Sequence, residues 1–249
     1  MPRGKVDAQP ACVLHSYPFR ETSLIVEVFS RDYGRVSLMA RGARRPRAAI
    51  RGLMMAFQPL ELGWAGKGEV LTLMKAEWQG GIPLLSGHAL LCGYYLNELL
   101  INLLPREDAH AVLFAHYSEM LCRLGVAKGK VAEADLRWFE KCLLQELGYG
   151  LTLTHDNRGH EVVPEQTYIY EIERGAVPMV QAQAMSSPAS FVSLVPSIVV
   201  QGQTLLDLYS DNFSDPRSQA EAKLLMRGLI AHYLGGKQLQ SRNIFKEIS

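Results

Sequence analysis

The sequence lacks any apolar run long enough to cross a membrane. Although 48% of its 249 residues are hydrophobic, no stretch approaches the roughly 20 apolar residues that a membrane-spanning helix requires. The basic residues of the first five positions are not followed by the apolar core of a secretory signal. We therefore expect a soluble, cytoplasmic protein.

Paired cysteines are also lacking. The four cysteines are far apart in sequence and form no C-x-x-C pair: Cys12, Cys92, Cys122 and Cys142. They are predicted to be reduced core residues. Of the seven histidines, only His155 and His160 lie close together, and two ligands are fewer than the three or four of a usual zinc site. The sequence therefore predicts no metal and no other cofactor.

Catalytic motifs are absent as well. There is no H-E-x-x-H and no G-x-S-x-G, and the acidic residues form no recognisable pair. Residues 63–67 look like a phosphate loop, but their spacing is too short and no Ser or Thr follows the lysine, so a hairpin turn is predicted. These absences favour a binding protein over an enzyme, and no catalytic residue is expected.

Charge is nearly balanced at +1 overall but unevenly distributed. Residues 1–80 hold 12 Lys and Arg against 7 Asp and Glu, whereas residues 81–249 hold 14 against 18. Seven arginines stand close together with Asp32 as the one acid among them: Arg31, Arg35, Arg41, Arg44, Arg45, Arg47 and Arg51. A surface that serves only solubility is usually of mixed sign. This patch instead favours contact with phosphates.

The first part of the chain has the pattern of a small barrel. Five short β-type runs are predicted, at residues 11–15, 24–29, 35–40, 59–64 and 70–78. A hairpin turn is predicted at residues 31–34, with Gly34 available for positive φ. The long connection after the third run suits a five-stranded OB barrel, although an SH3-like barrel would give a similar pattern.

After Pro83 the hydrophobic period changes to that of helices. Helices are predicted at residues 84–104, 108–125, 132–147 and 215–236, with a short terminal helix at 241–249. Gly148 is the expected C-cap of the third, and Asp215-Pro216 the expected start of the fourth. Residues 149–202 lose helical periodicity and suggest an inserted, loop-rich module.

These patterns predict an α+β multidomain protein. An N-terminal OB-fold β-barrel domain of residues 1–80 is followed by an α-helical domain of residues 81–249. A small loop-rich insert interrupts the helical domain at about residues 149–202.

Aromatic and basic side chains offer two further candidate sites. Five aromatics could stack on exposed bases, namely Tyr17, Phe19, Tyr33, Phe57 and Trp64. Barrel core is the better interpretation for Phe57 and Trp64, which lie in or beside apolar runs. The basic pairs Arg137 with Lys141 and Lys223 with Arg227 are typical surface decoration, since Glu133 can pair with Arg137. Alternatively, they form a basic rim that captures an acidic peptide with an apolar end.

Eight segments in register along nearly the whole chain carry a family resemblance. They are Val13-Leu14-His15-Ser16, Glu21-Thr22-Ser23-Leu24, Gly34-Arg35-Val36, Ala40-Arg41-Gly42-Ala43-Arg44, Phe57-Gln58-Pro59-Leu60, Asn97-Glu98-Leu99-Leu100, Leu147-Gly148-Tyr149-Gly150 and Tyr233-Leu234-Gly235-Gly236-Lys237. With these segments the sequence resembles the RecO family of bacterial DNA repair proteins.

The resemblance implies an OB-fold, a helical domain and, in many members, a zinc module held by four cysteines. Residues 149–202 contain no cysteine, so the insert should be metal-free here. RecO-like proteins bind single- and double-stranded DNA, anneal complementary strands, bind RecR and engage the acidic C-terminal tail of the single-strand binding protein SSB. With RecR they help RecA load onto SSB-coated DNA, which implies a nucleoid association during repair.

The resemblance also implies site residues. The DNA surface falls on Arg35, Arg41 and Arg44, followed by Arg45, Arg47 and Arg51. Arg137 matches an arginine of the SSB-tail pocket, with Lys141, Lys223 and Arg227 on the same rim. The competing hypothesis is an RNA-binding OB module of the translation apparatus, and an unrecognised hydrolase comes third.

Overall fold

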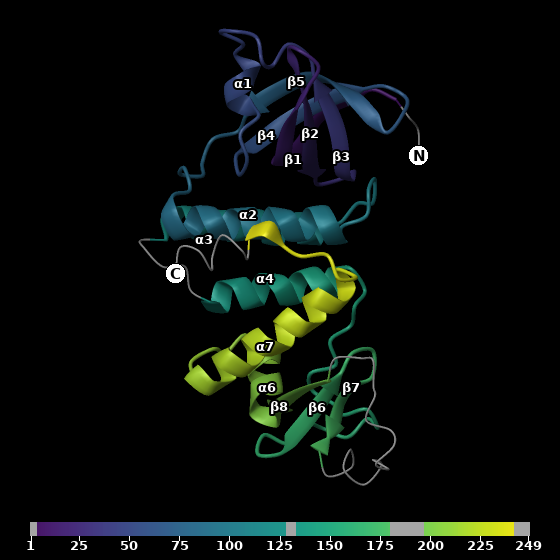
Figure 1. Cartoon of the computed structure of the whole chain (residues 1–249), viewed down its shortest axis with the longest axis vertical. Coiled ribbons are helices and arrows are strands. Elements are labelled where there is room, and N and C mark those ends of the chain that lie inside the picture. Colours follow the sequence, from purple (N-terminus) through teal and green to yellow (C-terminus); the bar gives the residue numbers. More distant parts are fainter. Residues whose placement is uncertain (1–3, 128–132, 180–196, 242–249) are drawn as a thin grey trace. The chain divides into compact units, whose positions relative to one another are not determined.

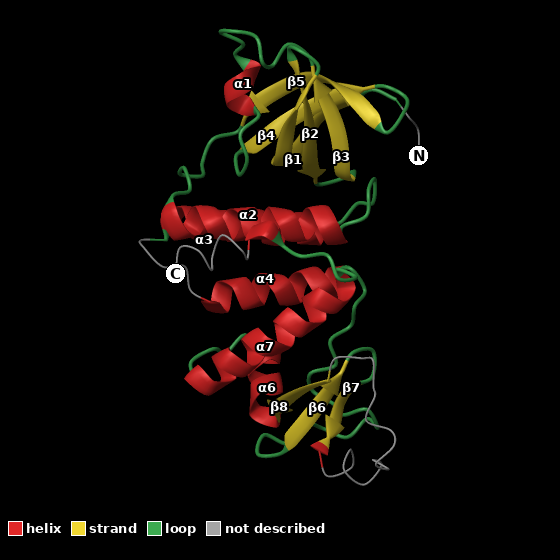
Figure 2. Ribbon diagram, in the orientation of Figure 1, coloured by secondary structure: helices red, strands yellow, loops and turns green. Residues whose placement is uncertain are grey.

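The computed structural model describes residues 4–127, 133–179 and 197–241 (Figures 1 and 2). The chain divides into two compact units. The first unit contains residues 1–131 together with residues 239–249, and the second contains residues 132–238. No helix in the described part of the chain is long and apolar enough to span a membrane.

A closed barrel of five strands opens the first unit. The strands are β1 (Val6–Phe19), β2 (Ser23–Ser30), β3 (Gly34–Ala40), β4 (Pro59–Ala65) and β5 (Val70–Trp78). They close in the order β1-β2-β3-β5-β4, with β3 and β5 parallel and the other pairs antiparallel. This is the arrangement of an OB-fold, and all five predicted strands are confirmed.

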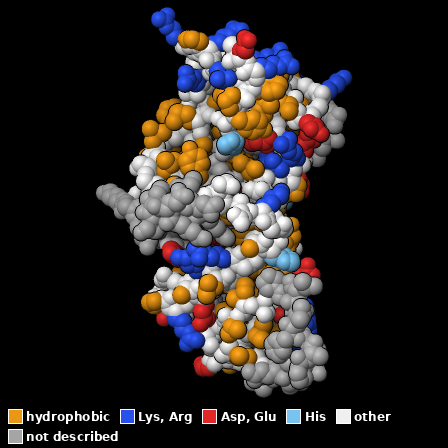
Figure 3. Space-filling model, in the orientation of Figure 1, with side chains coloured by type: hydrophobic (Ala, Val, Ile, Leu, Met, Phe, Trp, Pro, Cys, Tyr) orange, Lys and Arg blue, Asp and Glu red, His pale blue; other side chains and the backbone are white. Residues whose placement is uncertain are grey.

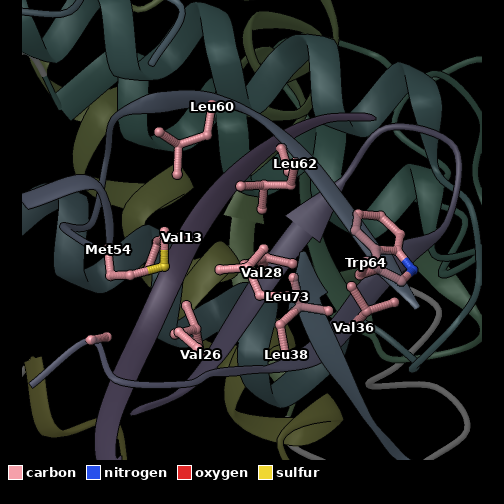
Figure 4. Packing of buried hydrophobic residues seen from close by; sticks show 13 residues of the cluster. Val13, Val26, Val28, Val36, Leu38, Met54, Leu60, Leu62, Trp64 and Leu73 are labelled. Carbon is pink, nitrogen blue, oxygen red and sulfur yellow. The ribbon is translucent and has the colours of Figure 1, made fainter. Parts of the chain in front are cut away.

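The barrel core follows from the period of two along the strands. Val26 and Val28 of β2 point inward and pack against residues such as Leu38 and Leu62 (Figure 4). Phe29, on the opposite face of β2, is also fully buried, because it packs outside the barrel against Phe114 of the following helical layer. Apolar residues therefore occupy both faces of this strand.

The β2–β3 turn depends on the glycine that the sequence singled out. Gly34 has a φ of +63°, as predicted. A Cβ atom at this position would lie 1.8 Å from the carbonyl oxygen of Asp108. The Arg35 carbonyl accepts a hydrogen bond from the Glu107 amide at 3.0 Å. Glycine therefore lets the segment after the first long helix pass directly against the turn.

Two long helices complete most of the first unit. They are α2 (Gly87–Leu103), which falls within the predicted helix 84–104, and α3 (Ala111–Val126), which agrees with the predicted helix 108–125 to within three residues at either end. Buried Asn97 of α2 donates a hydrogen bond to the Leu14 carbonyl at 2.7 Å and accepts one from the Tyr117 hydroxyl at 2.6 Å. This polar link orients both helices on the outer face of β1.

Glu98 of α2 binds a distant part of the chain. Its carboxylate accepts hydrogen bonds from the backbone amides of Gln240 and Ser241 at 2.6 and 2.9 Å. The Ser241 hydroxyl donates a third at 2.6 Å. Gln240 and Ser241 are helical, and the rest of the predicted terminal helix, residues 242–249, lies outside the described residues.

The second unit combines helices with a small sheet. Its helices are α4 (Glu133–Glu146), α6 (Gly202–Ser210) and α7 (Pro216–Tyr233). Its strands are β6 (Thr167–Glu171), β7 (Gly175–Pro178) and β8 (Ser197–Gln201), in the order β7-β6-β8. The predicted caps are confirmed, because Gly148 has a φ of +79° and the Asp215 side chain accepts from the Ser218 amide.

Helix α6 was not predicted from the sequence, and side chains from the two other helices satisfy its ends. At its start, the Glu221 carboxylate of α7 accepts from the Gln201 amide at 2.8 Å and from the Thr204 hydroxyl at 2.7 Å. At its end, the Lys141 ammonium of α4 donates to the carbonyls of Leu208 and Tyr209, both at 3.0 Å. Both partners lie far from α6 in sequence.

Candidate DNA-binding surface and a second basic site

The connection between β3 and β4 forms the candidate DNA-binding surface. Five predicted arginines are exposed in residues 41–51, here called the arginine loop: Arg41, Arg44, Arg45, Arg47 and Arg51. The last lies on the short helix α1 (Ile50–Leu53), which the sequence did not predict. Figure 3 shows Lys and Arg side chains gathered over the end of the barrel that carries α1. Within the described residues, no carboxylate forms an ion pair with these five guanidinium groups.

Two hydrogen bonds hold the arginine loop on the β1–β2 turn. The Arg44 amide donates to the Thr22 carbonyl at 2.8 Å, and the Arg44 guanidinium donates to the Arg20 carbonyl at 3.1 Å. Arg20 is itself exposed, with its guanidinium 5.2 Å from the centre of the Phe19 ring. Arg20 therefore extends the basic surface. Sequence reasoning missed it because it precedes the loop by 21 positions and only folding brings the two together.

Arg35 has a different environment from the arginine loop. Its side chain is 13% exposed and donates to the Glu27 carboxylate at 3.3 Å and to the Leu104 carbonyl at 3.1 Å. Burial lowers the pKa of Arg35, although Glu27 opposes that shift. Glu27 also binds Arg106 at 2.9 Å. Arg35 thus joins the barrel to the segment after α2 and is not part of the exposed arginine surface.

The outer face of β2 and β3 is largely covered. OB-folds commonly bind oligonucleotides across this face. Here Phe29 packs against Phe114 and Tyr117 of α3, and Glu27 is held by arginines. The arginine loop, at one end of the barrel, is accordingly the more accessible surface for a nucleic acid.

The aromatic candidates differ in exposure. Trp64 and Phe57 are 2% and 4% exposed, so their interpretation as core residues is confirmed. Tyr17 is partly exposed, and its hydroxyl donates to Glu27. Tyr33 stacks edge-on against Trp64. Sequence reasoning passed over Trp78, which is 59% exposed.

The second candidate site centres on Arg137 of α4. Arg137 is buried, and its Nη2 donates to Glu140 at 2.7 Å. In the described part of the chain, its Nε and Nη1 are buried without a hydrogen-bond partner. Two buried donors left in this way are costly, and a bound carboxylate or phosphate would satisfy both.

The other residues of the predicted rim have distinct roles. Lys141 is buried and also binds Asp211 at 2.6 Å, so it stabilises the end of α6. Lys223 pairs with Glu133 at 2.6 Å, joining α7 to the first turn of α4. Arg227 is exposed, as is Leu224 beside Lys223. Arg137 and Lys223 are therefore engaged in ion pairs on helices α4 and α7. Arg227 and Leu224 are exposed and accessible to a ligand.

The two neighbouring histidines lie in a turn closed by a carboxylate. Asp156 accepts from the amides of Arg158 and His160 at 2.8 and 2.9 Å and from the His160 ring at 3.1 Å. His155 is within hydrogen-bond distance of the Thr154 hydroxyl, at 2.9 Å. Among the described residues, no three His, Cys, Asp or Glu side chains are grouped to hold a metal ion.

Comparison with known proteins agrees with this architecture. Residues 7–81 match the family model of the recombination protein O N terminal, and residues 84–243 match that of its C terminal. The chain is 65% identical over 247 residues to the DNA repair protein RecO of Dechloromonas aromatica, covering 99% of this chain and 98% of the relative. The RecO proteins of Azoarcus sp. and Nitrosospira multiformis are 53% and 50% identical, over 98% and 97% of their lengths. The resemblance is confirmed, and the chain belongs to the RecO family of DNA repair proteins.

Proposed function

We propose that this chain is a DNA-binding recombination mediator. It anneals complementary single strands and, with RecR, helps RecA load onto SSB-coated single-stranded DNA in recombinational repair. Its family supports a role in DNA repair and recombination. Neither the comparisons nor the described structure favours the alternative of an RNA-binding module, and the proposal gives the chain no reaction of its own.

The arginine loop is the observation that carries the proposal. It presents five exposed guanidinium groups at one end of an OB barrel. Guanidinium groups neutralise phosphates and displace condensed counterions, whereas a recognition helix would be needed to read base edges in a groove. Binding should therefore be electrostatic and independent of sequence.

We also propose that the chain binds the C-terminal tail of SSB, and the site around Arg137 supports this part of the function. An acidic peptide that displaces the groups now covering Arg137 can supply a carboxylate to its Nε and Nη1. Its apolar end needs an anchor, for which exposed Leu224 beside Lys223 is a candidate. We propose Arg137, Lys223 and Arg227 as the rim of this site and give Lys141 a structural role.

A salt titration tests the DNA surface. If about five phosphates are neutralised, the logarithm of the affinity for single strands should fall with the logarithm of salt at a slope of about −3 to −4. Replacing Arg41 and Arg44 by Ala should reduce the steepness of that slope. Arg123→Ala, at an exposed arginine of α3, is the matched control. A flat salt response, or a strong preference for one sequence or for RNA, would contradict the proposal.

A further inference from the structure

Trp78, the last residue of β5, has an unusual exposure for its type. Tryptophan is mostly buried on average, yet this one is 59% exposed. Its indole N–H donates to the Gln58 side-chain oxygen at 3.1 Å. Gln58 in turn donates to the Ile82 carbonyl at 3.4 Å. The polar edge of the ring is thus tied to the protein while much of its surface remains in solvent.

The fold places Trp78 at the end of the barrel that bears the arginine loop. Gln58, its hydrogen-bond partner, lies in the five-residue connection between α1 and β4. Helix α1, which carries exposed Arg51, packs against β5 (Figure 1). Met55 of the same connection is 49% exposed. An exposed thioether therefore lies on the connection that leads from the arginine loop into β4, and the exposed indole lies on the strand residue that pairs with Leu60 at the start of β4.

This combination has a known chemical use. Proteins that bind single strands join a basic groove, which follows the phosphates, to aromatic rings on which unpaired bases stack. A duplex offers no such base, because its bases are already stacked on one another. The phosphate contacts of the arginine loop serve both forms of DNA, whereas an exposed indole serves only a strand with free bases.

The other aromatics of the barrel are less suited to this role. Phe19 is half-buried, and the Arg20 guanidinium lies over its ring, 5.2 Å from the centre. Trp64 and Phe57 are buried, and Tyr33 packs against Trp64. Tyr17 is engaged with Glu27 on the partly covered outer face. We propose that Trp78 is the ring on which an unpaired base of single-stranded DNA stacks, and that it favours single strands over duplex at this surface. The inference rests on the proposed DNA binding of the arginine loop.

Three DNA probes test the inference by fluorescence anisotropy at one salt concentration. They are an oligothymidylate of about 20 nucleotides, longer than the roughly 4–16 nucleotides that one OB-fold occupies, an abasic strand of the same length, and a duplex. Trp78→Ala should weaken binding to oligothymidylate about 5- to 150-fold, the usual scale for one stacked base. Affinity for the abasic strand and for the duplex should stay unchanged.

Matched variants separate stacking from other effects. Trp78→Phe keeps a ring and should retain most of the affinity for oligothymidylate. Trp138→Phe, a substitution in the second unit, should behave as wild type. If Trp78→Ala loses the same affinity for the abasic strand as for oligothymidylate, or loses affinity for neither, Trp78 does not stack on a base.

Intrinsic fluorescence gives a second measurement that does not depend on affinity. Saturating oligothymidylate should quench the tryptophan emission of the wild type, and this change should disappear in Trp78→Phe. Quenching that persists in Trp78→Phe would overturn the inference. Double replacement of Arg41 and Arg44 tests the proposed function separately, because it should weaken all three probes. Wild-type binding by that variant would show that the arginine loop itself was misassigned.

Discussion

At the scale of single residues, Gly34 is a position where no other residue fits without strain. Its φ is +63°, and any Cβ would collide with the backbone of Asp108. Gly34→Ala should reduce the free energy of unfolding by more than about 3 kcal/mol, since the left-handed conformation alone costs roughly 1–2 kcal/mol and the collision adds to it. Urea denaturation measures the loss.

Gly42 provides the matched control for this prediction. Its φ of +70° is similar, but the nearest atom to an added Cβ is 3.6 Å away, on the Arg45 side chain. Gly42→Ala should therefore cost only the conformational part, about 1 kcal/mol. Equal losses in the two variants would show that the approach of Asp108 contributes nothing.

At the scale of elements, α6 depends on a carboxylate of α7. Burial raises the pKa of Glu221, but hydrogen bonds from the Gln201 amide, the Thr204 hydroxyl and Arg217 together outweigh it and leave the pKa below its ordinary value of 4.5. A carboxyl whose pKa is lower in the folded state stabilises the protein above the unfolded pKa. That stabilisation is lost as the pH falls through the folded pKa.

Glu221→Gln should therefore destabilise the protein in a pH-dependent way. At pH 7 the loss should be about 1–3 kcal/mol, the scale of hydrogen bonds to a charged group. The difference from wild type should shrink as the pH falls below 4.5. Parallel urea titrations at neutral and acidic pH measure it, and Glu119→Gln, which removes an exposed ion pair with Arg123, should show little effect at either pH. A loss that is independent of pH would mean that the charge of Glu221 is irrelevant.

The insert allows a prediction about metal content. Its turn at residues 156–160 is closed by the Asp156 carboxylate, and residues 149–202 contain no cysteine. We expect the purified protein to contain no stoichiometric zinc and to unfold at the same temperature with and without a chelator. Elemental analysis that finds one zinc per chain would contradict this expectation.

Elements with a local signal were predictable, and those with distant determinants were not. The barrel strands and four long helices follow from periods of 2 and 3.6 and from caps such as Asp215 and Gly148. Helix α6 escaped prediction because the groups that complete its ends, Glu221 and Lys141, belong to other helices. The four-residue helix α1 is too short to show a period.

Candidate site residues divide in the same way. The arginine loop was visible because its charges lie close together in sequence, and its five arginines are exposed. Burial of Arg35 beside Glu27, and of Lys141 at the end of α6, depends on partners that no local pattern reveals. Trp78 was missed because its exposure at the end of β5 depends on the fold, and no local pattern of the strand reveals it.

At the scale of the whole molecule, we predict separate surfaces for the two ligands. The arginine loop belongs to the first unit and Arg137 to the second. Arg137→Ala should weaken binding of an SSB-tail peptide by about 1–3 kcal/mol, the scale of a charged hydrogen bond, with DNA affinity nearly unchanged. Replacing Arg41 and Arg44 by Ala should weaken DNA binding and leave the affinity for the SSB-tail peptide nearly unchanged.

Affinities of both variants for both ligands, at one salt concentration, decide this prediction. Because Arg137 is buried against Glu140, thermal unfolding must show that Arg137→Ala is folded, and Arg227→Ala gives an exposed alternative on the same rim. If Arg137→Ala weakens DNA binding as strongly as it weakens peptide binding, the two ligands share one surface.

The bond between Glu98 and Ser241 sets an order of events during synthesis. The second unit is inserted between the two parts of the first, so Glu98 meets Gln240 and Ser241 only after the inserted unit has been made. At about 5–20 residues per second, the 143 residues that separate Glu98 from Ser241 take roughly 7–30 s to translate. N-terminal domains generally fold first on the ribosome. In this chain the barrel can form early, but the unit that contains it acquires the contacts of Glu98 only after the inserted unit has been translated.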